Sequence, residues 1–367
     1  APTTGGTALG AGSAPVAFSR AITGLTAGTT YFYCAIASSA IGTGFGAVQS
    51  FTTPGAPTVT TSAATTIGST TATLNGAANP NLGDATGWFR YSTTSPGTCN
   101  DTFGTRAPAS GGASLGGGLT VQPYSQTITG LTPLTTYFVC AIASNGLGTG
   151  FGFVGTFTTP APPTVTTTAV TVLADTSAQL NGNANPNRAT TTGWFRYSTT
   201  NPGTCNDTFG SRAPTSGGSS LGAGSSATAY AQSIGSLSPS TTYYYCAIAS
   251  NSEGTSFGAV LSFTTIGVPL VTTNAVTLLN PTTVTLNGNA NPNGATSTGF
   301  FRYATTSPGV CNDAFGTRAP ASSGTGLGAG TAGVAYSQPI AGLTPATTYF
   351  YCAIANNLYG NGFGALL

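Results

Sequence analysis

The sequence predicts an all-β protein built from tandem β-sandwiches, and three observations support this prediction. Val, Thr, Tyr and Phe, which favour strands, are frequent, and no stretch shows a sustained 3.6-residue period. The 53 Gly and 23 Pro residues provide many turns, while apolar residues, at 40% of the 367, suffice for hydrophobic cores. Finally, one long segment recurs at a fixed interval along the chain.

The repeat has a constant length. The segment that begins at Tyr31 recurs from Tyr137, Tyr243 and Tyr349, in steps of 106 residues (137 − 31, 243 − 137 and 349 − 243). No insertion or deletion separates the copies, so we interpret them as duplications under one uniform structural requirement. A chain that begins within a repeat is expected to be a window on a longer repetitive protein or fibre. The predicted domains are a partial repeat, which is the C-terminal half of a sandwich, and three further repeats: 1–54, 55–160, 161–266 and 267–367.

Within each repeat, strands follow one another at the spacing of a β-sandwich. A turn at Asn185-Pro-Asn separates the second strand from the third, since proline presets φ and asparagine caps the turn. In the second complete repeat we expect strands at 164–168, 177–182, 194–200, 229–234, 243–249 and 257–265.

The order of these motifs resembles bacterial fibronectin type III repeats over essentially the whole chain. The motifs are a Leu strand leading into Asn-Pro-Asn, an aromatic-x-Tyr strand, Leu-x-Pro-x-Thr-x-Tyr, and a closing Phe-Thr-Thr. The segment from Leu237 to Tyr243 is similar to the tyrosine corner, in which a phenol bonds back to nearby backbone. The resemblance implies tandem fibronectin type III-like (immunoglobulin-like) β-sandwiches. It also implies a spacer or adhesive module in secreted and surface proteins, without an active site.

Charged residues are scarce, at 4% of the chain against about 25% in an average globular protein. A net charge of +2 gives no basic patch, so nucleic acid is not an expected partner. A surface of Thr, Ser, Asn and Gly has few charges to desolvate, which favours self-association. No apolar run reaches the roughly 18 residues of a membrane span, and the chain begins without a signal peptide, which we expect to be removed or upstream.

No catalytic, metal or cofactor site is expected. The chain lacks His and Lys, and only Asp101, Asp207 and Asp313 recur among its acids, one in each repeat. Paired carboxylates at a shared site are therefore not encoded. A metal site would need His or a Cys-x-x-Cys pair, and a phosphate loop would need Lys. The sequence predicts a protein that is not an enzyme.

The cysteines predict one disulfide bond in each complete repeat. Each of these repeats has two cysteines at a constant separation, while Cys34 lies in the partial repeat without a partner. Such bonds indicate an oxidising, extracellular compartment. Free buried thiols are one alternative, and bonds between repeats, beginning with Cys34–Cys99, are another. The predicted pairs are Cys99–Cys140, Cys205–Cys246 and Cys311–Cys352.

Strand alternation places this bridge on the outer face of a sheet. If Tyr137 and Val139 face the core, then Cys140 and Ile142 face outward, as does Trp88 on the neighbouring strand. Such a face is too apolar for solvent. The segment 95–108 with its Gly-rich continuation is surplus to a usual fibronectin domain. We expect it to fold over this face, pinned by the disulfide and with Phe103 as a further contact.

Aromatic side chains on these outer faces are candidate interaction residues. Stacking of sugars on Trp88 and Trp194 is one alternative, but the third repeat has Phe300 there, and no acidic or amide cluster recurs nearby. Internal packing or contact between subunits is the favoured interpretation. The candidates are Trp88, Trp194, Phe300, Phe138, Tyr244 and Phe350.

The remaining recurrent polar residues lie in or beside the surplus segment. Asp101, with Arg90 and Arg106, predicts a local ion pair. Asn100 and Asn206 begin Asn-x-Thr sequons and are candidate glycosylation sites. The third repeat reads Asn-Asp-Ala at this place and breaks the sequon, which favours a turn-forming role for the asparagine.

Two functions fit these observations. The first is a structural protein of the prokaryotic cell surface that self-associates into an extracellular filament, sheath or stalk. The second is an adhesive or carbohydrate-binding spacer region of a larger secreted or surface protein. The fixed step, the uncharged surface and short proline-rich junctions such as 158–164 favour the first.

Overall fold

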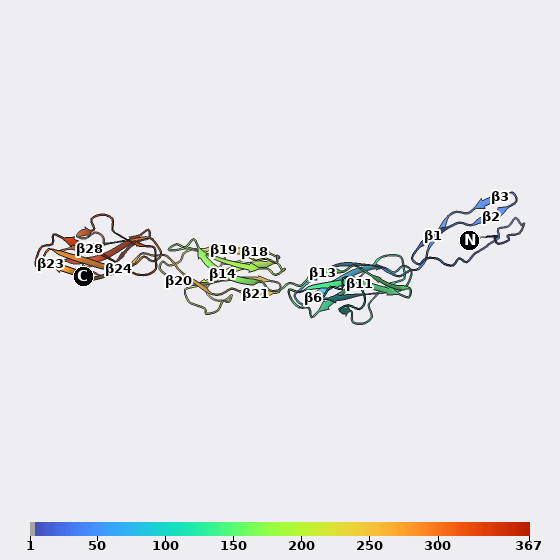
Figure 1. Ribbon diagram of the computed structural model, residues 1–367, viewed down its shortest axis with the longest axis horizontal. Coiled ribbons are helices and arrows are strands. Elements are labelled where there is room, and N and C mark those ends of the chain that lie inside the picture. Colours follow the sequence, from blue (N-terminus) through green and yellow to red (C-terminus); the bar gives the residue numbers. More distant parts are fainter. Residues whose placement is uncertain (1–3) are drawn as a thin grey trace. The chain divides into compact units, whose positions relative to one another are not determined.

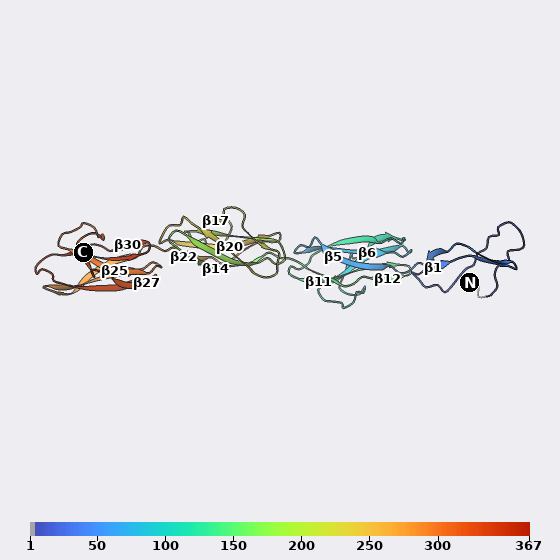
Figure 2. The ribbon, with the colours of Figure 1, turned by 90° about the horizontal axis from the view of Figure 1, so that it is seen from above.

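The computed structural model describes residues 4–367, and strands are its only regular secondary structure. The all-β prediction is therefore confirmed, and this part of the chain has no helix that could cross a membrane. The chain divides into two compact units, Ala1–Ala161 and Pro162–Leu367. Each complete repeat within them is a pair of facing antiparallel sheets (Figures 1 and 2).

The described part of the partial repeat forms two short ribbons. They are β1 (Thr30–Tyr33) paired with β4 (Gln49–Thr52), and β2 (Ile36–Ser39) paired with β3 (Gly42–Phe45). Tyr33 and Ile36 are 54% and 53% exposed, whereas their counterparts Val139 and Ile142 in the next repeat are buried. These strands are exposed because no second sheet covers them within residues 4–54.

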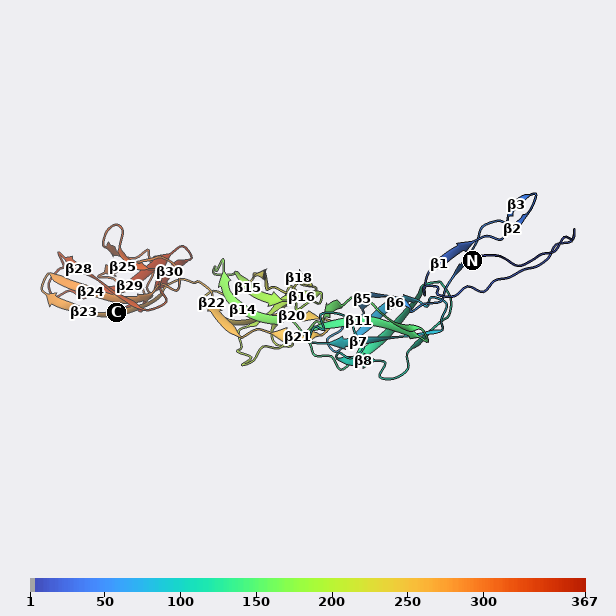
Figure 3. The ribbon, with the colours of Figure 1, turned by 45° about the vertical axis from the view of Figure 1, so that its right-hand side comes forward.

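The repeat at 55–160 has a three-stranded sheet, in the order β10-β6-β5, facing a six-stranded one. The larger sheet has the order β12-β11-β7-β8, with β13 also pairing with β11 and β9 with β7 (Figure 3). The strands are β5 (Thr58–Thr65), β6 (Thr71–Asn79), β7 (Ala85–Ser92), β8 (Thr105–Ala107), β9 (Ala113–Gly116), β10 (Gln122–Thr129), β11 (Thr136–Asn145), β12 (Gly148–Phe151) and β13 (Gly155–Thr158).

The second unit holds two sandwiches with the same connections. The first has sheets β14-β15-β19 and β17-β16-β20-β21, with β18 on β16 and β22 on β20. Its strands are β14 (Thr164–Thr171), β15 (Ala178–Asn185), β16 (Thr191–Ser198), β17 (Ser211–Ala213), β18 (Ser219–Gly222), β19 (Thr228–Ile234), β20 (Thr242–Asn251), β21 (Gly254–Phe257) and β22 (Leu261–Thr264).

The last sandwich has sheets β23-β24-β28 and β26-β25-β29-β30, with β27 on β25. Its strands are β23 (Leu270–Asn280), β24 (Thr283–Asn291), β25 (Ser297–Ala304), β26 (Thr317–Ala319), β27 (Thr325–Gly328), β28 (Val334–Ala341), β29 (Phe350–Asn357) and β30 (Gly360–Phe363). The strand order common to these three sandwiches is that of a fibronectin type III-like fold. The sheets lie within the predicted repeats, whose boundaries stay predictions.

Side chains that alternate along β6 build the core of the first complete sandwich. Its inward residues, such as Leu74, are buried, and its outward residues are half-buried and polar apart from Ala77. At Gly76 the facing sheet comes so close that a Cβ would lie 2.7 Å from the Ala141 methyl group. Tyr124 packs on Phe89 at 5.0 Å between ring centroids and donates its hydroxyl to the Ile142 carbonyl at 2.9 Å. Burial raises the pKa of Tyr124 above its ordinary value.

The tyrosine corner implied by the family resemblance is present. The Tyr243 hydroxyl accepts a hydrogen bond from the backbone N–H of Ser238 at 2.9 Å. The Tyr137 hydroxyl accepts the same bond from Thr132. This bond fixes the connection into the long strand that carries the second cysteine.

Thr61 links the two sheets through its side chain. Its buried hydroxyl donates to the Phe153 carbonyl at 2.6 Å and accepts from the Ala141 N–H at 3.0 Å. Thr61 belongs to the small sheet, while Ala141 lies on β11 of the large sheet and Phe153 in the connection between β12 and β13. Thr167 and Thr273 accept the equivalent N–H bonds from Ala247 and Ala353, each at 3.0 Å.

The structure corrects two predictions about the strands. The closing strand expected at 257–265 is two strands, β21 and β22. Between them, the Ala247 N–H of β20 donates to the Thr167 hydroxyl instead of to the closing strand. A Cβ on Gly258 would lie 2.4 Å from that hydroxyl, so glycine is required at the break. The surplus segment is also more than a loop, since β17 and β18 return it to the edge of β16.

We predict that replacing Thr61, Thr167 and Thr273 together by Val lowers the free energy of unfolding by about 1–3 kcal/mol per repeat. Valine keeps the shape but leaves the buried N–H of Ala141 and its counterparts without an acceptor. Urea denaturation followed by circular dichroism measures the loss. The matched control is Val at Thr60, Thr166 and Thr272, which are exposed on the same strands. Equal stability of the two triple variants would contradict the role of the buried hydroxyl.

Candidate functional site

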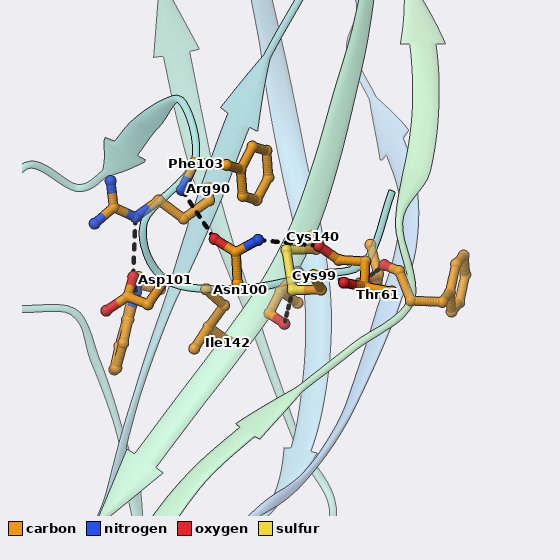
Figure 4. The surroundings of a disulfide bond; sticks show 12 residues. Thr61, Arg90, Cys99, Asn100, Asp101, Phe103, Cys140 and Ile142 are labelled. Atoms are coloured by element: carbon orange, nitrogen blue, oxygen red, sulfur yellow. Dashed lines mark hydrogen bonds and ion pairs between the residues drawn. A yellow bond between two sulfur atoms is a disulfide. The ribbon is translucent and has the colours of Figure 1, made fainter. Parts of the chain in front are cut away.

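A second apolar cluster lies on the outer face of the large sheet. In the first complete repeat it consists of Trp88 from β7, Cys140 and Ile142 from β11, and Cys99 and Phe103 from the loop 93–104. Figure 4 labels the last four of these residues. We call these five residues the outer cluster. Cys140 and Ile142 have no exposed surface. The predicted place of the loop, over the outer face with Phe103 in contact, is where the structure has it.

A disulfide bond fixes the loop to the sheet. Cys99 and Cys140, 41 residues apart in sequence, are joined with their Cα atoms 5.9 Å apart. The same bond joins Cys205 to Cys246 and Cys311 to Cys352, so neither free thiols nor bonds between repeats occur among these six. Cys34 is free and exposed. On a chain-entropy basis, closing a loop of this length stabilises the fold by about 4 kcal/mol.

Asp101 ties the loop to two side chains of β7. One carboxylate oxygen accepts hydrogen bonds from Trp88 Nε1 at 2.8 Å and from Arg90 Nε at 2.9 Å. Burial alone would raise the pKa of the Asp101 carboxyl. The hydrogen bonds from Arg90 and Trp88, with the positive charges of Arg90 and Arg106, outweigh burial and hold this pKa below its ordinary value. The local ion pair is therefore between strand and loop.

Arg106 covers the Trp88 ring. Its guanidinium carbon lies 4.6 Å from the ring centroid, and its nitrogens donate to the carbonyls of Pro108 and Gly111. Arg106 lies opposite Arg90 in the pairing of β8 with β7, so the short strand β8 positions this cover. The indole N–H and one ring face of Trp88 are thus both engaged within the repeat.

Trp88, Trp194 and Phe300 pack inside their own repeats, in agreement with the favoured interpretation, and an interaction role for them stays a prediction. Their exposed fractions are 8%, 8% and 2%, because the loop and a stacked arginine cover each ring. Stacking of sugars on the two tryptophans would have to displace the arginine from the ring and the loop that binds the indole N–H. The other three candidates lie beyond the outer cluster and are half-buried, and an interaction role for them stays a prediction: Phe138, Tyr244 and Phe350.

Asn100 shapes the loop directly after Cys99. Its side-chain oxygen accepts the backbone N–H groups of Thr102 and Phe103 at 3.0 and 3.1 Å (Figure 4). This turn directs Asp101 and Phe103 toward the sheet. In the third repeat, Asn312 accepts the N–H of Ala314 at 2.9 Å. The predicted turn-forming role is confirmed, while glycosylation stays a prediction.

A cleft of about 540 Å³ opens in the last repeat beside Tyr349, Tyr351 and Leu286. In the two preceding repeats, Phe157 and Phe263 stack on the counterparts of Tyr349 at 5.5 and 5.6 Å. The cleft therefore corresponds to a core position of the sandwich. Within residues 4–367, no three His, Cys, Asp or Glu side chains lie together as metal ligands.

No known family model matches this chain, and no curated protein sequence does. Solved structures with some likeness include the chicken CNTN1 FN1–FN3 domains. They are 17% identical with a TM-score of 0.27, and the match covers 86% of this chain and 97% of that one. The titin I-band fragment I67–I69 is 12% identical with a TM-score of 0.32, over 84% of this chain and 97% of that one. The fold class rests on the strand order described above.

We predict that removing the three disulfides lowers the free energy of unfolding by about 4 kcal/mol per repeat. The change is Ala at both cysteines of each pair, and the measurement is guanidinium denaturation with and without reductant. The single variant Cys34→Ser is the matched control, since Cys34 has no partner. A loss below about 1 kcal/mol, or an equal loss in the control, would show that the loop does not depend on its bond.

We predict that acid loosens the loop through Asp101. Its folded pKa lies below the ordinary value of 3.8, so its stabilising contribution is complete above that value and disappears as the pH falls through the folded pKa. The substitution Trp194→Phe leaves Trp88 as the single tryptophan of the chain. In that background, Trp88 emission should change with a midpoint below pH 3.8. Adding Asp101→Asn should abolish the transition, and its persistence would assign it to another acid.

Proposed function

We propose that this chain is a structural repeat protein of the prokaryotic cell surface. Its repeats would self-associate into an extracellular filament, sheath or stalk. The observation that carries this proposal is the internal closure of each complete repeat. Even the apolar outer face of the large sheet is sealed by the repeat's own loop, disulfide and stacked arginine. Such a unit needs no partner to fold, and it can be copied many times.

The chemistry of the surface supports self-association. With 4% charged residues, two copies that meet have few ions to desolvate, and like-charge repulsion between them is small. Three disulfides support an oxidising compartment outside the cell. The recurrent acid of each repeat is held by an arginine at 2.9–3.0 Å, which supports a role for it in structure rather than catalysis.

The alternative is a spacer that holds an adhesive or carbohydrate-binding domain away from the cell. Both functions use rigid disulfide-bonded units, and they differ in whether the chains associate. The engaged tryptophans remove the aromatic platform that sugar binding by these repeats would use. We therefore give the structural polymer precedence, without nucleic acid or membrane partners.

Electron microscopy of the purified oxidised chain tests this proposal. We expect regular fibres or sheets with an axial period set by the repeats. Assembly should persist in 1 M salt, because interfaces poor in charge are hardly screened. Light scattering over a concentration series provides the second measurement. Single, dispersed chains at all concentrations would overturn the polymer and support the spacer. Assembly that dissolves in salt would contradict the proposed neutral interface.

A further inference from the structure

We propose that Asn100 and Asn206 carry sugars on their side-chain amide nitrogens, while Asn312 does not. All three asparagines occupy the same turn in the loop over the outer cluster. The first two are followed by Asp-Thr, and the third by Asp-Ala. An Asn-x-Thr sequence is the acceptor signal for N-linked glycosylation.

The turn accounts for the asparagines but not for the threonines. In the third repeat, Asn312 Oδ1 accepts the N–H of Ala314 at 2.9 Å, and the neighbouring ion pair Arg302–Asp313 is kept at 3.0 Å. The loop therefore forms its turn and its ion pair without a hydroxyl at that position. In the first two complete repeats, the exposed hydroxyls of Thr102 and Thr208 are therefore an addition to a turn that also forms without them.

The threonine hydroxyls fix the orientation of the amides. Thr102 Oγ1 donates to Asn100 Oδ1 at 2.8 Å, alongside the two backbone N–H groups bound to that oxygen. Thr208 Oγ1 donates to Asn206 Oδ1 at 2.8 Å in the same arrangement. With three donors on the oxygen, the amide nitrogen is held on the opposite side of the group.

The amide nitrogen of each asparagine carries two hydrogens, and the turn uses one of them in a hydrogen bond. Asn100 Nδ2 donates one of its two hydrogens to the Thr98 carbonyl at 3.1 Å, and Asn206 Nδ2 donates to the Thr204 carbonyl at 3.4 Å. Glycosylation forms a bond between Nδ2 and the anomeric carbon of a sugar carried on a diphosphate donor. The bond from that carbon to the donor oxygen breaks, the diphosphate leaves with the electron pair, and the displaced proton passes to a base of the transferase. The remaining N–H keeps its hydrogen bond to the Thr98 or Thr204 carbonyl, so the turn is unchanged.

Asn100 and Asn206 are half-buried, and they lie in loops that are largely exposed directly before them. Residues 93–95, 97 and 98 are exposed, and the disulfide at Cys99 anchors the chain directly before Asn100. A sugar there would extend from the cover of the outer cluster into solvent. It would also hydrate a surface that carries very few charges.

Peptide mass spectrometry of the chain from its natural source tests the proposal directly. Arginines flank each loop, so trypsin after reduction and alkylation releases the peptides 91–106, 197–212 and 303–318. We expect a sugar mass on Asn100 and Asn206 in the first two peptides, and none on the third. Unmodified first and second peptides would overturn the proposal, as would an equal modification of Asn312.

Variants made in an N-glycosylating secretory host separate the signal from the turn. Thr102→Ala and Thr208→Ala should lose the sugar, whereas Thr102→Ser should retain it. The matched gain-of-site variant Ala314→Thr should add a sugar to Asn312. Non-reducing peptide mapping confirms that each variant keeps its disulfides. If the asparagines serve the turn alone, none of these substitutions adds or removes a sugar mass, and the proposal fails.

Discussion

Strand β11 is buried on both faces, and the rest of each repeat follows from that constraint. Its inward side chains, such as Val139 and Ala141, fill the sandwich. Its outward side chains Cys140 and Ile142 are equally free of solvent. A strand of that kind needs cover on two sides, yet a two-sheet sandwich provides only one. The loop 93–104 supplies the other, and bonding it to Cys140 makes the cover permanent.

Close approach of the two sheets is the second requirement. The Thr61 hydroxyl reaches the large sheet because Gly150 and Gly152 leave room for β5. A Cβ at Gly150 would lie 1.9 Å from the Pro57 carbonyl oxygen, and one at Gly152 would lie 2.4 Å from the Thr61 hydroxyl. These contacts close one side of the sandwich, so its edge is not left free to pair with other chains. The sequence Gly-x-Gly-Phe-Gly at 148–152 and 360–364 thus reflects a contact between strands far apart in the chain. At 254–258, where it reads Gly-Thr-Ser-Phe-Gly, serine replaces the first of these two glycines, and the one beside the threonine hydroxyl is kept.

Much of this was predictable from the sequence, because strand alternation is a local property. The alternation along 137–143 separated the core residues from the outer cluster, and the constant cysteine separation identified the disulfides. The strands β8 and β9 were missed because they are short, rich in polar residues and glycine, and defined only by pairing with β7. The stacking of Arg106 on Trp88 was likewise hidden, since it depends on β8 bringing the arginine over the ring.

The third complete repeat shows which contacts over the outer face are kept when the tryptophan is replaced. Phe300 replaces tryptophan there and cannot donate to the loop carboxylate, yet Asp313 still accepts from Arg302 at 3.0 Å. Arg318 still stacks over the ring, at 4.0 Å from its centroid. The indole N–H is therefore an addition, while the ion pair and the stacked guanidinium recur in all three repeats. In a chain with so few charges, most of the arginines are thus used to hold one loop in place. That concentration leaves few positive charges on the rest of the surface and places most of them in the closure of each unit.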